Sequence, residues 1–357
     1  MAWEETVKPA VEFLGKMKTG SKVAVILGHD DDTVCSAAVI YRLLKKIGMK
    51  PSLVVSGQNF TITDDAVARV RKLKPDYIVV LDIADIGIEL MDKLKKIGGV
   101  LNIDHHNVKP YAGITYVNPR IADAHAYIPV SYLCYRIYAE FLDADDISWI
   151  AGIGTLGDHG VTNCLDLFKK VNERYPELIG GKELVDEKLY DGSIIGKLAS
   201  VVDSARVAVG PKGSMKAVKV LIDAKSYNDV TGNKQLKNWY TQTRLEFRRI
   251  VEDFWKNKTE RDDIVFYVIT SKYNFKSALS GYLQQSFANK IIMIGHKDGD
   301  VLDISFRRGA KVNTDLSQLA AKVVKSIPNS TGGGHEAASA VRVPIGKVGE
   351  LLKILSK

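Results

Sequence analysis

Aspartate and histidine side chains gather at four places in the first 160 residues, each directly after an apolar run. These places are residues 29–32 (HDDD), Asp82, residues 104–106 (DHH) and residues 157–160 (GDHG). A single aspartate after a strand is commonly a helix cap, but four such clusters at one sheet edge would repel one another without a cation. Mixed carboxylate and imidazole ligands suit Mn²⁺ or Mg²⁺, and a carboxylate shared by two ions suits phosphoryl transfer.

A parallel sheet would bring these clusters to one edge. Short β-branched runs occur at residues 22–27, 52–56, 77–82, 100–104 and 115–119, and helical patterns separate most of them. This alternation predicts a parallel sheet with helices on both faces. Ligands bind at the carboxyl ends of the strands in such sheets, and we expect all four clusters to follow strand ends. The fourth cluster ends the apolar stretch that begins at Trp149.

The rest of the chain predicts a helical segment and a second α/β domain. Residues 232–258 have the pattern of one long helix, with Tyr240, Phe247 and Phe254 seven residues apart, a spacing that favours packing over base stacking. From residue 263, strands are expected at 264–270, 291–295 and 301–306, with helices near 276–288 and 314–326. The predicted fold is therefore α/β, with a parallel-sheet domain at 1–160, a mostly helical segment at 161–262 and a smaller α/β domain at 263–357.

The charge of the chain is divided between its two halves. The 357 residues carry a net charge of +8; residues 1–200 hold 24 basic and 27 acidic side chains, a net charge of −3, and residues 201–357 hold 26 and 15, a net charge of +11. An acidic half that holds cations and a basic half that holds phosphates would fit a nucleic-acid substrate.

Composition limits the class of protein and its compartment. The 46% hydrophobic content excludes a disordered or fibrous protein. The three cysteines are too few for a disulfide framework, and the N-terminus has no apolar region typical of a signal peptide, so we expect a cytoplasmic protein. No apolar run approaches the roughly 20 residues of a membrane helix. Scarce glutamine and plentiful Lys, Ile and Val favour a thermophile, with motifs of archaeal style.

The third cluster, Asp104-His105-His106 after a hydrophobic run, resembles the motif of the DHH phosphoesterase superfamily. That superfamily includes RecJ-like exonucleases, nano-RNases, cyclic-dinucleotide phosphodiesterases and family II pyrophosphatases. The other clusters resemble its remaining motifs in the same order, over about residues 20–160. Two positions depart from the family pattern: Thr33 replaces a usual glycine, and Ile26 stands where some relatives have a metal-binding histidine, for which His29 is a poor substitute.

The resemblance implies roles for the clustered residues. It implies two Mn²⁺ ions, or Mg²⁺, bound by Asp82 as the bridging ligand, by Asp30 for the first ion, and by Asp32, His105 and Asp158 for the second. It also implies that His106 contacts the scissile phosphate or protonates the leaving oxygen, and that Asp104 orients the histidines. The neighbouring residues Asp31, Asp85 and His159 are interpreted as solvated or capping residues.

The basic half contains a string of glycines before a histidine. Three glycines ahead of a helix would make a backbone anion site, while a plain flexible loop is the alternative. The string resembles the signature of the DHHA1 domain, and residues 305–307 (SFR) resemble its phosphate-holding strand. The substrate-binding residues that this implies are Ser305, Arg307, Gly332, Gly333, Gly334 and His335. Pyrophosphatases carry a different C-terminal domain, so the string argues against them.

Three functions fit these observations. The favoured one is a Mn²⁺-dependent 3′→5′ exonuclease on single-stranded DNA or RNA, with a role in DNA repair or replication. The second is a phosphoesterase of small substrates, such as a nano-RNase, a cyclic-dinucleotide hydrolase or a 3′-phosphoadenosine phosphate phosphatase. The third, a non-catalytic replication scaffold, is disfavoured because every expected metal ligand is present. We expect a homo-oligomer, with the helix at 232–258 as the candidate contact, and a repair or replication protein as a further partner.

Overall fold

The protein is described by a computed structural model that covers residues 3–57, 61–83 and 86–355. The chain divides into two compact units, unit 1 up to Tyr240 and unit 2 from Thr241. The segment 161–262, predicted as a helical connection, is therefore divided between the units, with most of it in unit 1.

Unit 1 is built around a five-stranded parallel sheet with the strand order β2-β1-β3-β4-β5. Its strands are β1 (Lys22–Leu27), β2 (Lys50–Val55), β3 (Tyr77–Leu81), β4 (Gly99–Ile103) and β5 (Thr115–Val117). The prediction of a parallel sheet from these five runs is confirmed. Because β1 lies between β2 and β3, the chain changes direction across the sheet there, which is where ligands bind in such folds.

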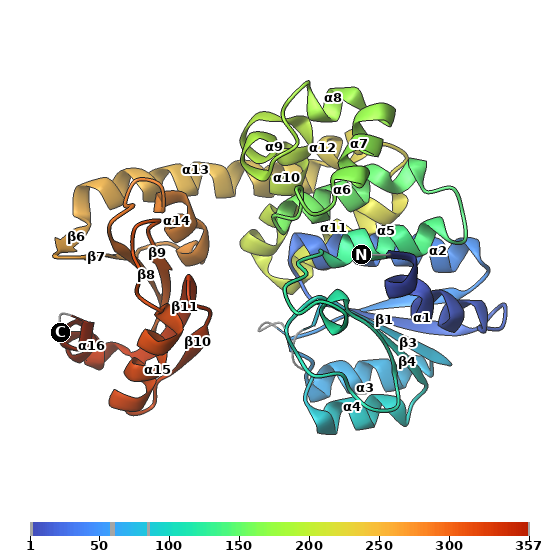
Figure 1. Ribbon diagram of the computed structural model, residues 1–357, viewed down its shortest axis with the longest axis horizontal. Coiled ribbons are helices and arrows are strands. Elements are labelled where there is room, and N and C mark those ends of the chain that lie inside the picture. The colour runs from blue at the N-terminus through green and yellow to red at the C-terminus, as the bar shows by residue number, and fades with distance from the viewer. Residues whose placement is uncertain (1–2, 58–60, 84–85, 356–357) are drawn as a thin grey trace. The chain divides into compact units, whose positions relative to one another are not determined.

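Helices cover both faces of this sheet (Figure 1). Val23, Val25 and Leu27 of β1 belong to a core that includes side chains of α1 (Trp3–Gly15) and α2 (Asp31–Lys46). Ala24 and Ile26 belong to a second core with α3 (Asp64–Leu73) and α4 (Ile88–Lys95). Burial on both faces explains why the strands are almost continuous apolar runs.

The apolar stretch that begins at Trp149 is a helix, which corrects the expectation that the fourth cluster follows a strand. It forms α6 (Ser148–Gly157), and Asp158 is its C-terminal cap. All residues from Ser148 to Leu156 are buried, because α6 packs against α2, α5 (Val130–Ala139) and α10 (Ile194–Val209). A helix buried on every side has no polar face, so its sequence pattern does not distinguish it from a buried strand.

The remaining helices of unit 1 extend this layer over the start of α2. They are α7 (Leu165–Arg174), α8 (Pro176–Ile179), α9 (Asp186–Gly192), α10, α11 (Pro211–Asp223) and α12 (Tyr227–Gly232), with short 3₁₀ turns at Pro119–Ile121 and Asp145–Ile147. α11 packs against α2, and α10 packs against α6 and α11. Ser214 of α11 donates its hydroxyl to the backbone oxygen of His29 at 2.6 Å. Late helices therefore cover the strand-to-helix turn that carries the first cluster.

The long helix predicted at residues 232–258 is α13 (Lys234–Asn257). Phe254 is fully buried, and the ring of Phe247 contacts the rings of Phe275 and Tyr282 within unit 2. Packing is thus the role of these two aromatic residues. Across the ranges that the structure covers, no helix combines the length and apolar character needed to cross a membrane.

Unit 2 contains a six-stranded mixed sheet in the order β10-β11-β9-β8-β7-β6. Its strands are β6 (Thr259–Arg261), β7 (Ile264–Ile269), β8 (Ile291–Asp298), β9 (Val301–Arg308), β10 (Thr331–Gly334) and β11 (Ala338–Pro344). The helices are α14 (Lys276–Leu283), α15 (Leu316–Ser326) and α16 (Val348–Leu355), with a 3₁₀ turn at Ile345–Lys347. β7 and β8 pair in parallel, and the other neighbouring strands are antiparallel. The α/β prediction for both ends of the chain is confirmed.

The glycine string does not precede a helix, which corrects the expectation of an anion site at a helix N-terminus. Residues 332–334 lie in the edge strand β10, and a tight turn at His335 leads into β11. Glycine is required here by close approach: a Cβ on Gly332 would lie 2.5 Å from the backbone oxygen of Ala340. Gly334 also has a φ of 143°, which side-chain-bearing residues rarely adopt.

Gly154→Ala tests the close packing that positions α6. A Cβ at this position would lie 2.8 Å from the Cβ atoms of Cys35 in α2 and Ser131 in α5. Because the neighbouring helices must then move apart, we expect the free energy of unfolding to fall by about 1–3 kcal/mol in urea denaturation. The control is Gly232→Ala in α12, where a Cβ meets no atom within 4 Å. Equal stability of the Gly154 and Gly232 variants would contradict the prediction.

Candidate metal centre

The carboxyl ends of the central strands bring the clusters together. Asp82 and Asp104 directly follow β3 and β4, and their backbone N–H groups donate to Ile103 and Val117 on the neighbouring strands, both at 2.9 Å. Two sets of three side chains have potential ligand atoms within 4.8 Å of one another: Asp82, His105 and His106, and Asp32, His105 and Asp158. His105 belongs to both sets. We call them ligand group 1 and ligand group 2 in that order.

Asp30 lies outside both ligand groups and caps α2. Its Oδ1 accepts the backbone N–H of Thr33 at 2.9 Å and also contacts the Thr33 hydroxyl. The same hydroxyl lies 2.8 Å from Oδ2 of Asp82. Thr33, which stands where the sequence comparison led us to expect glycine, therefore links Asp30 to Asp82 and leaves the strand-to-helix turn intact.

Asp32 is held by the first residues of α5. Its Oδ2 accepts the backbone N–H of Val130 at 2.7 Å, and its Oδ1 accepts that of Ser131 at 2.9 Å. The positive end of a helix favours a carboxylate at this position. Burial nevertheless raises the pKa of Asp32 to about 6, because the charged form is removed from water.

Asp82 is the most constrained residue of the centre. It is 4% exposed and has a φ of 54°, the left-handed region that non-glycine residues adopt only when their surroundings compensate for the strain. Burial, followed by the charges of Asp30 and Asp32, raises its pKa well above the ordinary value. Its Oδ1 lies 3.4 Å from His105 Nε2 and 3.6 Å from His106 Nδ1.

The two adjacent histidines have opposite electrostatic environments. Burial lowers the pKa of His105 to about 4, so this imidazole is neutral and able to bind a metal at neutral pH. The pKa of His106 is raised, because its Nδ1 is bonded at 2.7 Å to Oδ1 of Asp104 and this attraction outweighs the effect of burial. Opposite pKa shifts in neighbouring titratable groups are typical of sites where the two side chains have different chemical roles.

Asp158 is held by a tyrosine that our sequence reasoning did not identify. The hydroxyl of Tyr127 lies 2.8 Å from Oδ2 of Asp158 and 3.0 Å from its backbone oxygen. The ring of Tyr127 packs against the ring of His105, with 5.3 Å between their centroids. Burial, followed by the charge of Asp32, raises the pKa of Asp158 to about 8.

The polar atoms of the centre fit divalent cations. Oδ1 of Asp82 and Nδ1 of His105 are buried and have no hydrogen-bond partner within the described chain. Several buried carboxylates also raise one another's pKa, which a cation would reverse. Oxygen donors with imidazole nitrogen suit Mn²⁺ or Mg²⁺, and no thiolate belongs to either group.

Asp31 is buried, so the interpretation of this residue as solvated is wrong. It is 8% exposed, and its carboxylate fills the space in which Gly157 would carry a Cβ. Burial, then the charge of Asp203 in α10, raises its pKa, while Arg206 of the same helix has the opposite effect. Arg206 itself is bonded to Asp203 at 2.6 Å. The side chains of His29 and Asp30 belong to neither ligand group. His159 is exposed, as expected. Asp85 lies outside the described residues.

The expected substrate residues lie on the edge strand β10, on the inner strand β9 and in the turn after β10. In the strand pairing, Gly333 of β10 lies opposite Ala340 of β11, which lies opposite Ser305 of β9. Arg307 of β9 lies opposite Ala338 of β11. Ser305 is buried, with its hydroxyl 3.1 Å from that of Ser280. Arg307 is half-buried, and its Nε has no hydrogen-bond partner in the described part of the chain. His335 is exposed in the turn between β10 and β11.

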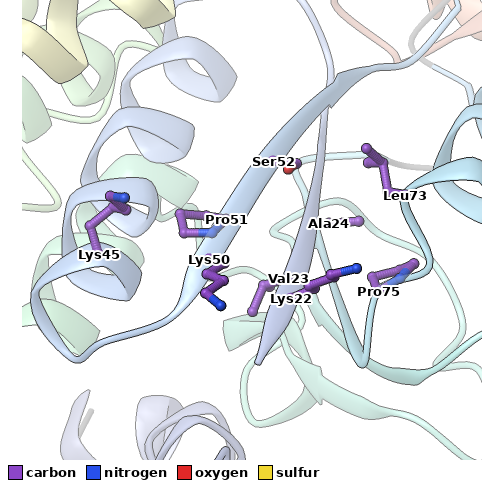
Figure 2. A pocket seen from close by; sticks show the side chains of 9 residues that line it. All are labelled: Lys22, Val23, Ala24, Lys45, Lys50, Pro51, Ser52, Leu73 and Pro75. Atoms are coloured by element: carbon purple, nitrogen blue, oxygen red, sulfur yellow. The ribbon is translucent and has the colours of Figure 1, made fainter. Parts of the chain in front are cut away.

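A separate hollow of about 270 Å³ lies at the opposite end of the parallel sheet (Figure 2). Lys22, Val23 and Ala24 at the start of β1 line it together with Lys50 and Pro51 of β2. The metal centre lies beyond the other end of β1, so this hollow is not part of it. Its charged lining consists of exposed lysines, which need no ligand.

The sequence model of the N-terminal domain of the DHH family matches residues 22–157. These residues belong to the DHH family. The DHH domain therefore contains every residue of the two ligand groups except Asp158, which follows its last matched residue directly.

Solved structures share the fold of the whole chain. RecJ from Thermus thermophilus in complex with Mn²⁺ is 14% identical with a TM-score of 0.73, and the match covers 98% of this chain and 54% of that one. This chain thus spans about half the length of that protein. An exonuclease RecJ bound to manganese is 13% identical with a TM-score of 0.69, over 99% and 93% of the two chains. CDC45 from Entamoeba histolytica is 12% identical with a TM-score of 0.57, over 99% and 98%.

Likeness at these identities shows a common fold, in which the DHH domain is joined to a second α/β domain. No curated protein sequence matches the chain.

The structure adds residues to the DHH domain site that our sequence reasoning missed. Thr33 and Tyr127 each bond a carboxylate of a ligand group, and the start of α5 binds a third. Thr33 was visible as a departure from the family pattern. Tyr127 gave no signal, because it lies in an irregular segment after β5 and far in sequence from Asp158.

The raised pKa of Asp158 predicts a pH dependence of stability in the metal-free chain. Its folded pKa, about 8, exceeds the ordinary value of 3.8, so between these values the folded chain retains a proton that the unfolded chain has lost, and stability falls as pH rises. His105, whose pKa is lowered, has the opposite effect, but only below the ordinary histidine value of 6.5. His106, whose pKa is raised, adds to the fall above that value.

We therefore expect the melting temperature in EDTA to decrease between pH 6.5 and 8. Asp158→Asn removes one of the titrating groups and should make the decrease of melting temperature with pH less steep. The difference corresponds to roughly one proton at most, released on unfolding. Excess Mn²⁺ should abolish the decrease, because metal binding requires the deprotonated carboxylates. A melting temperature that rises over this range in EDTA would contradict the prediction.

Proposed function

We propose that the protein is a Mn²⁺-dependent exonuclease that degrades single-stranded DNA or RNA in the 3′→5′ direction, with Mg²⁺ as the alternative metal. The observation that carries this proposal is the pair of ligand groups that share His105 in the DHH domain. Two adjacent divalent cations would activate a water for in-line attack and neutralise charge on the phosphoryl group. A role in DNA repair or replication is part of the proposal.

The residues of the centre divide into ligands and a proton donor. We assign Asp30 and Asp82 to the first ion and Asp32, His105 and Asp158 to the second, with Asp82 bridging the two. His106 belongs geometrically to ligand group 1, but its Nδ1 is already engaged by Asp104 at 2.7 Å. That bond raises the pKa of His106, which favours a role for this imidazole as the acid that protonates the leaving oxygen. Asp104 orients the ring.

Unit 2 supplies the proposed nucleotide-binding surface. We propose that residues 263–357 form a DHHA1 domain, joined to the DHH domain at 1–160 by the helices of 161–262. Its edge strand, Ser305, Arg307 and His335 would bind the phosphate and terminal nucleotide of the strand. The unpartnered Nε of Arg307 supports this, because a buried guanidinium nitrogen without an acceptor is costly unless a ligand supplies one. The net charge of +11 over residues 201–357 supports a long polyanion.

The assembly and compartment of the enzyme are further parts of the proposal. We propose a homo-oligomer that contacts a repair or replication protein. A reducing, cytoplasmic compartment fits the three cysteines, which are buried and unpaired.

A time course with end-labelled single strands tests the proposal. DNA and RNA 20-mers labelled at either end are incubated with the chain and Mn²⁺, and products are separated by length. A ladder that shortens from the 3′ end supports the proposal, and shortening from the 5′ end overturns the polarity. A preference of more than about tenfold for a dinucleotide at equal concentration would favour the small-substrate phosphoesterase instead.

Asp82→Ala tests the bridging ligand. Because this change removes a ligand shared by both ions, we expect less than about 1% of the activity on the 20-mer to remain. The control is Asp64→Ala, whose exposed side chain pairs with Lys93 of α4 and should leave activity unchanged. Substantial residual activity of Asp82→Ala would remove this residue from the bridging position.

His335→Ala tests the turn between β10 and β11. We expect weaker binding of the 20-mer, measured by fluorescence anisotropy, because an exposed cationic or hydrogen-bonding group is lost from the proposed phosphate surface. Mn²⁺ binding, measured by calorimetry on the same variant, should remain at the wild-type level. An unchanged affinity for the strand would exclude His335 from the site.

A further inference from the structure

One short segment contacts all three members of ligand group 2. Residues 127–131 connect the irregular chain after β5 to the start of α5. The hydroxyl of Tyr127 bonds Asp158, its ring packs against His105, and the N–H groups of Val130 and Ser131 bond Asp32. In ligand group 1, the Thr33 hydroxyl bonds Asp82 and the Asp104 carboxylate bonds His106, and the segment 127–131 contacts this group only through the ring of His105.

The contact between Tyr127 and Asp158 involves Oδ2 of Asp158, the carboxylate oxygen that faces His105 of ligand group 2. Oδ2 of Asp158, which lies 2.8 Å from the tyrosine hydroxyl, is also the oxygen 3.7 Å from Nδ1 of His105. That nitrogen is buried without a hydrogen-bond partner in the described residues. The tyrosine O–H uses one lone pair of Oδ2 and leaves the other available to a cation. It therefore fixes the carboxylate plane with Oδ2 towards His105.

Tyr127 is itself held in place from two sides. Its backbone oxygen accepts the side-chain N–H of Asn163 at 2.9 Å. Two residues on, Pro129 packs against Gly160, where a Cβ would lie 2.4 Å from the proline Cγ. Both contacts join the segment to the turn that follows Asp158. The tyrosine and the carboxylate are therefore positioned by the same local structure, and a small movement of one would carry the other.

Without this bond, Asp158 would have little to orient it. It caps the C-terminal end of α6, where backbone carbonyl groups disfavour a negative charge. Its side chain is also 30% exposed, so a carboxylate without the tyrosine could turn towards water. Partners that orient a metal ligand typically change metal affinity by about 10–100-fold when they are removed.

We propose that Tyr127 is a positioning residue that sets the affinity of ligand group 2 for its cation, with residues 127–131 as the rigid template of that group. This inference rests on the proposed function only in requiring that the centre binds two divalent cations. It assigns to ligand group 2 a dependence on the Tyr127 hydroxyl, which bonds Asp158 and, in the described residues, no member of ligand group 1.

The test is a Mn²⁺ titration of the metal-free chain of 357 residues by isothermal calorimetry, with Mn²⁺ electron paramagnetic resonance as a second readout. For Tyr127→Phe, which retains the ring against His105 and removes only the hydroxyl, one of two binding events should weaken about 10–100-fold and the other should be unchanged. The Mn²⁺ concentration for half-maximal activity should rise by a similar factor, with kcat at saturating Mn²⁺ retained.

Tyr116→Phe is the matched control. The hydroxyl of Tyr116 lies 3.3 Å from Oδ2 of Asp104, a carboxylate outside both ligand groups, and this change should leave both binding events at wild-type affinity. Asn163→Ala is the second variant, for use if Tyr127→Phe does not fold. It frees the backbone of Tyr127 and should weaken the same single binding event.

The outcomes separate the inference from the proposed function. A selective loss at one site in Tyr127→Phe or Asn163→Ala supports the inference. Two binding events of wild-type affinity in Tyr127→Phe, or an equal loss at both sites, overturn it and leave the proposed function standing. A wild-type chain that binds no Mn²⁺ overturns the proposed function and the inference together.

Discussion

Repulsion among buried carboxylates is the constraint on which the structure of unit 1 depends. Asp32 and Asp82 are buried and Asp158 is partly buried, and both burial and the charges of neighbouring aspartates raise their pKa values. Such a cluster is stable only where N–H groups, hydroxyls or cations compensate. Thr33, Tyr127 and the start of α5 supply part of this compensation, and the unpartnered atoms Asp82 Oδ1 and His105 Nδ1 leave room for cations.

The parallel sheet and the helical layer make different contributions to the centre. The sheet alone ends two neighbouring strands with Asp82 and Asp104, so it produces ligand group 1 almost directly. Ligand group 2 requires helices: α5 binds Asp32 through its first N–H groups, and α6 ends at Asp158. Close packing of α6 through glycines lets these helices approach α2. The two ligand groups are therefore positioned largely by different parts of the fold.

Much of the architecture could be predicted from the sequence because local patterns determine it. The β-branched runs that form the parallel sheet are short, apolar and flanked by helical patterns, and they predict its five strands. The helical pattern of residues 232–258 predicts α13. In unit 2 the sequence predicts only β7, β8 and β9 of the six strands. The expectation of a strand from Trp149 is wrong, since a helix buried on all sides has no periodic signal. The glycine string was expected before a helix, but Gly332 and Gly334 are glycines because β10 lies against β11, a contact that no local pattern encodes.

The sequence by itself identifies the aspartates and histidines that could bind cations and their order along the chain, because ligand chemistry depends on residue type and a short motif such as residues 104–106 is visible without any structure. It did not determine how these residues are oriented. That Thr33 links two carboxylates, that Asp31 is buried against Gly157 and that Tyr127 holds Asp158 were decided by tertiary structure alone. The physical reason is that orientation comes from hydrogen bonds between segments far apart in the chain, and these exist only once the helices have packed.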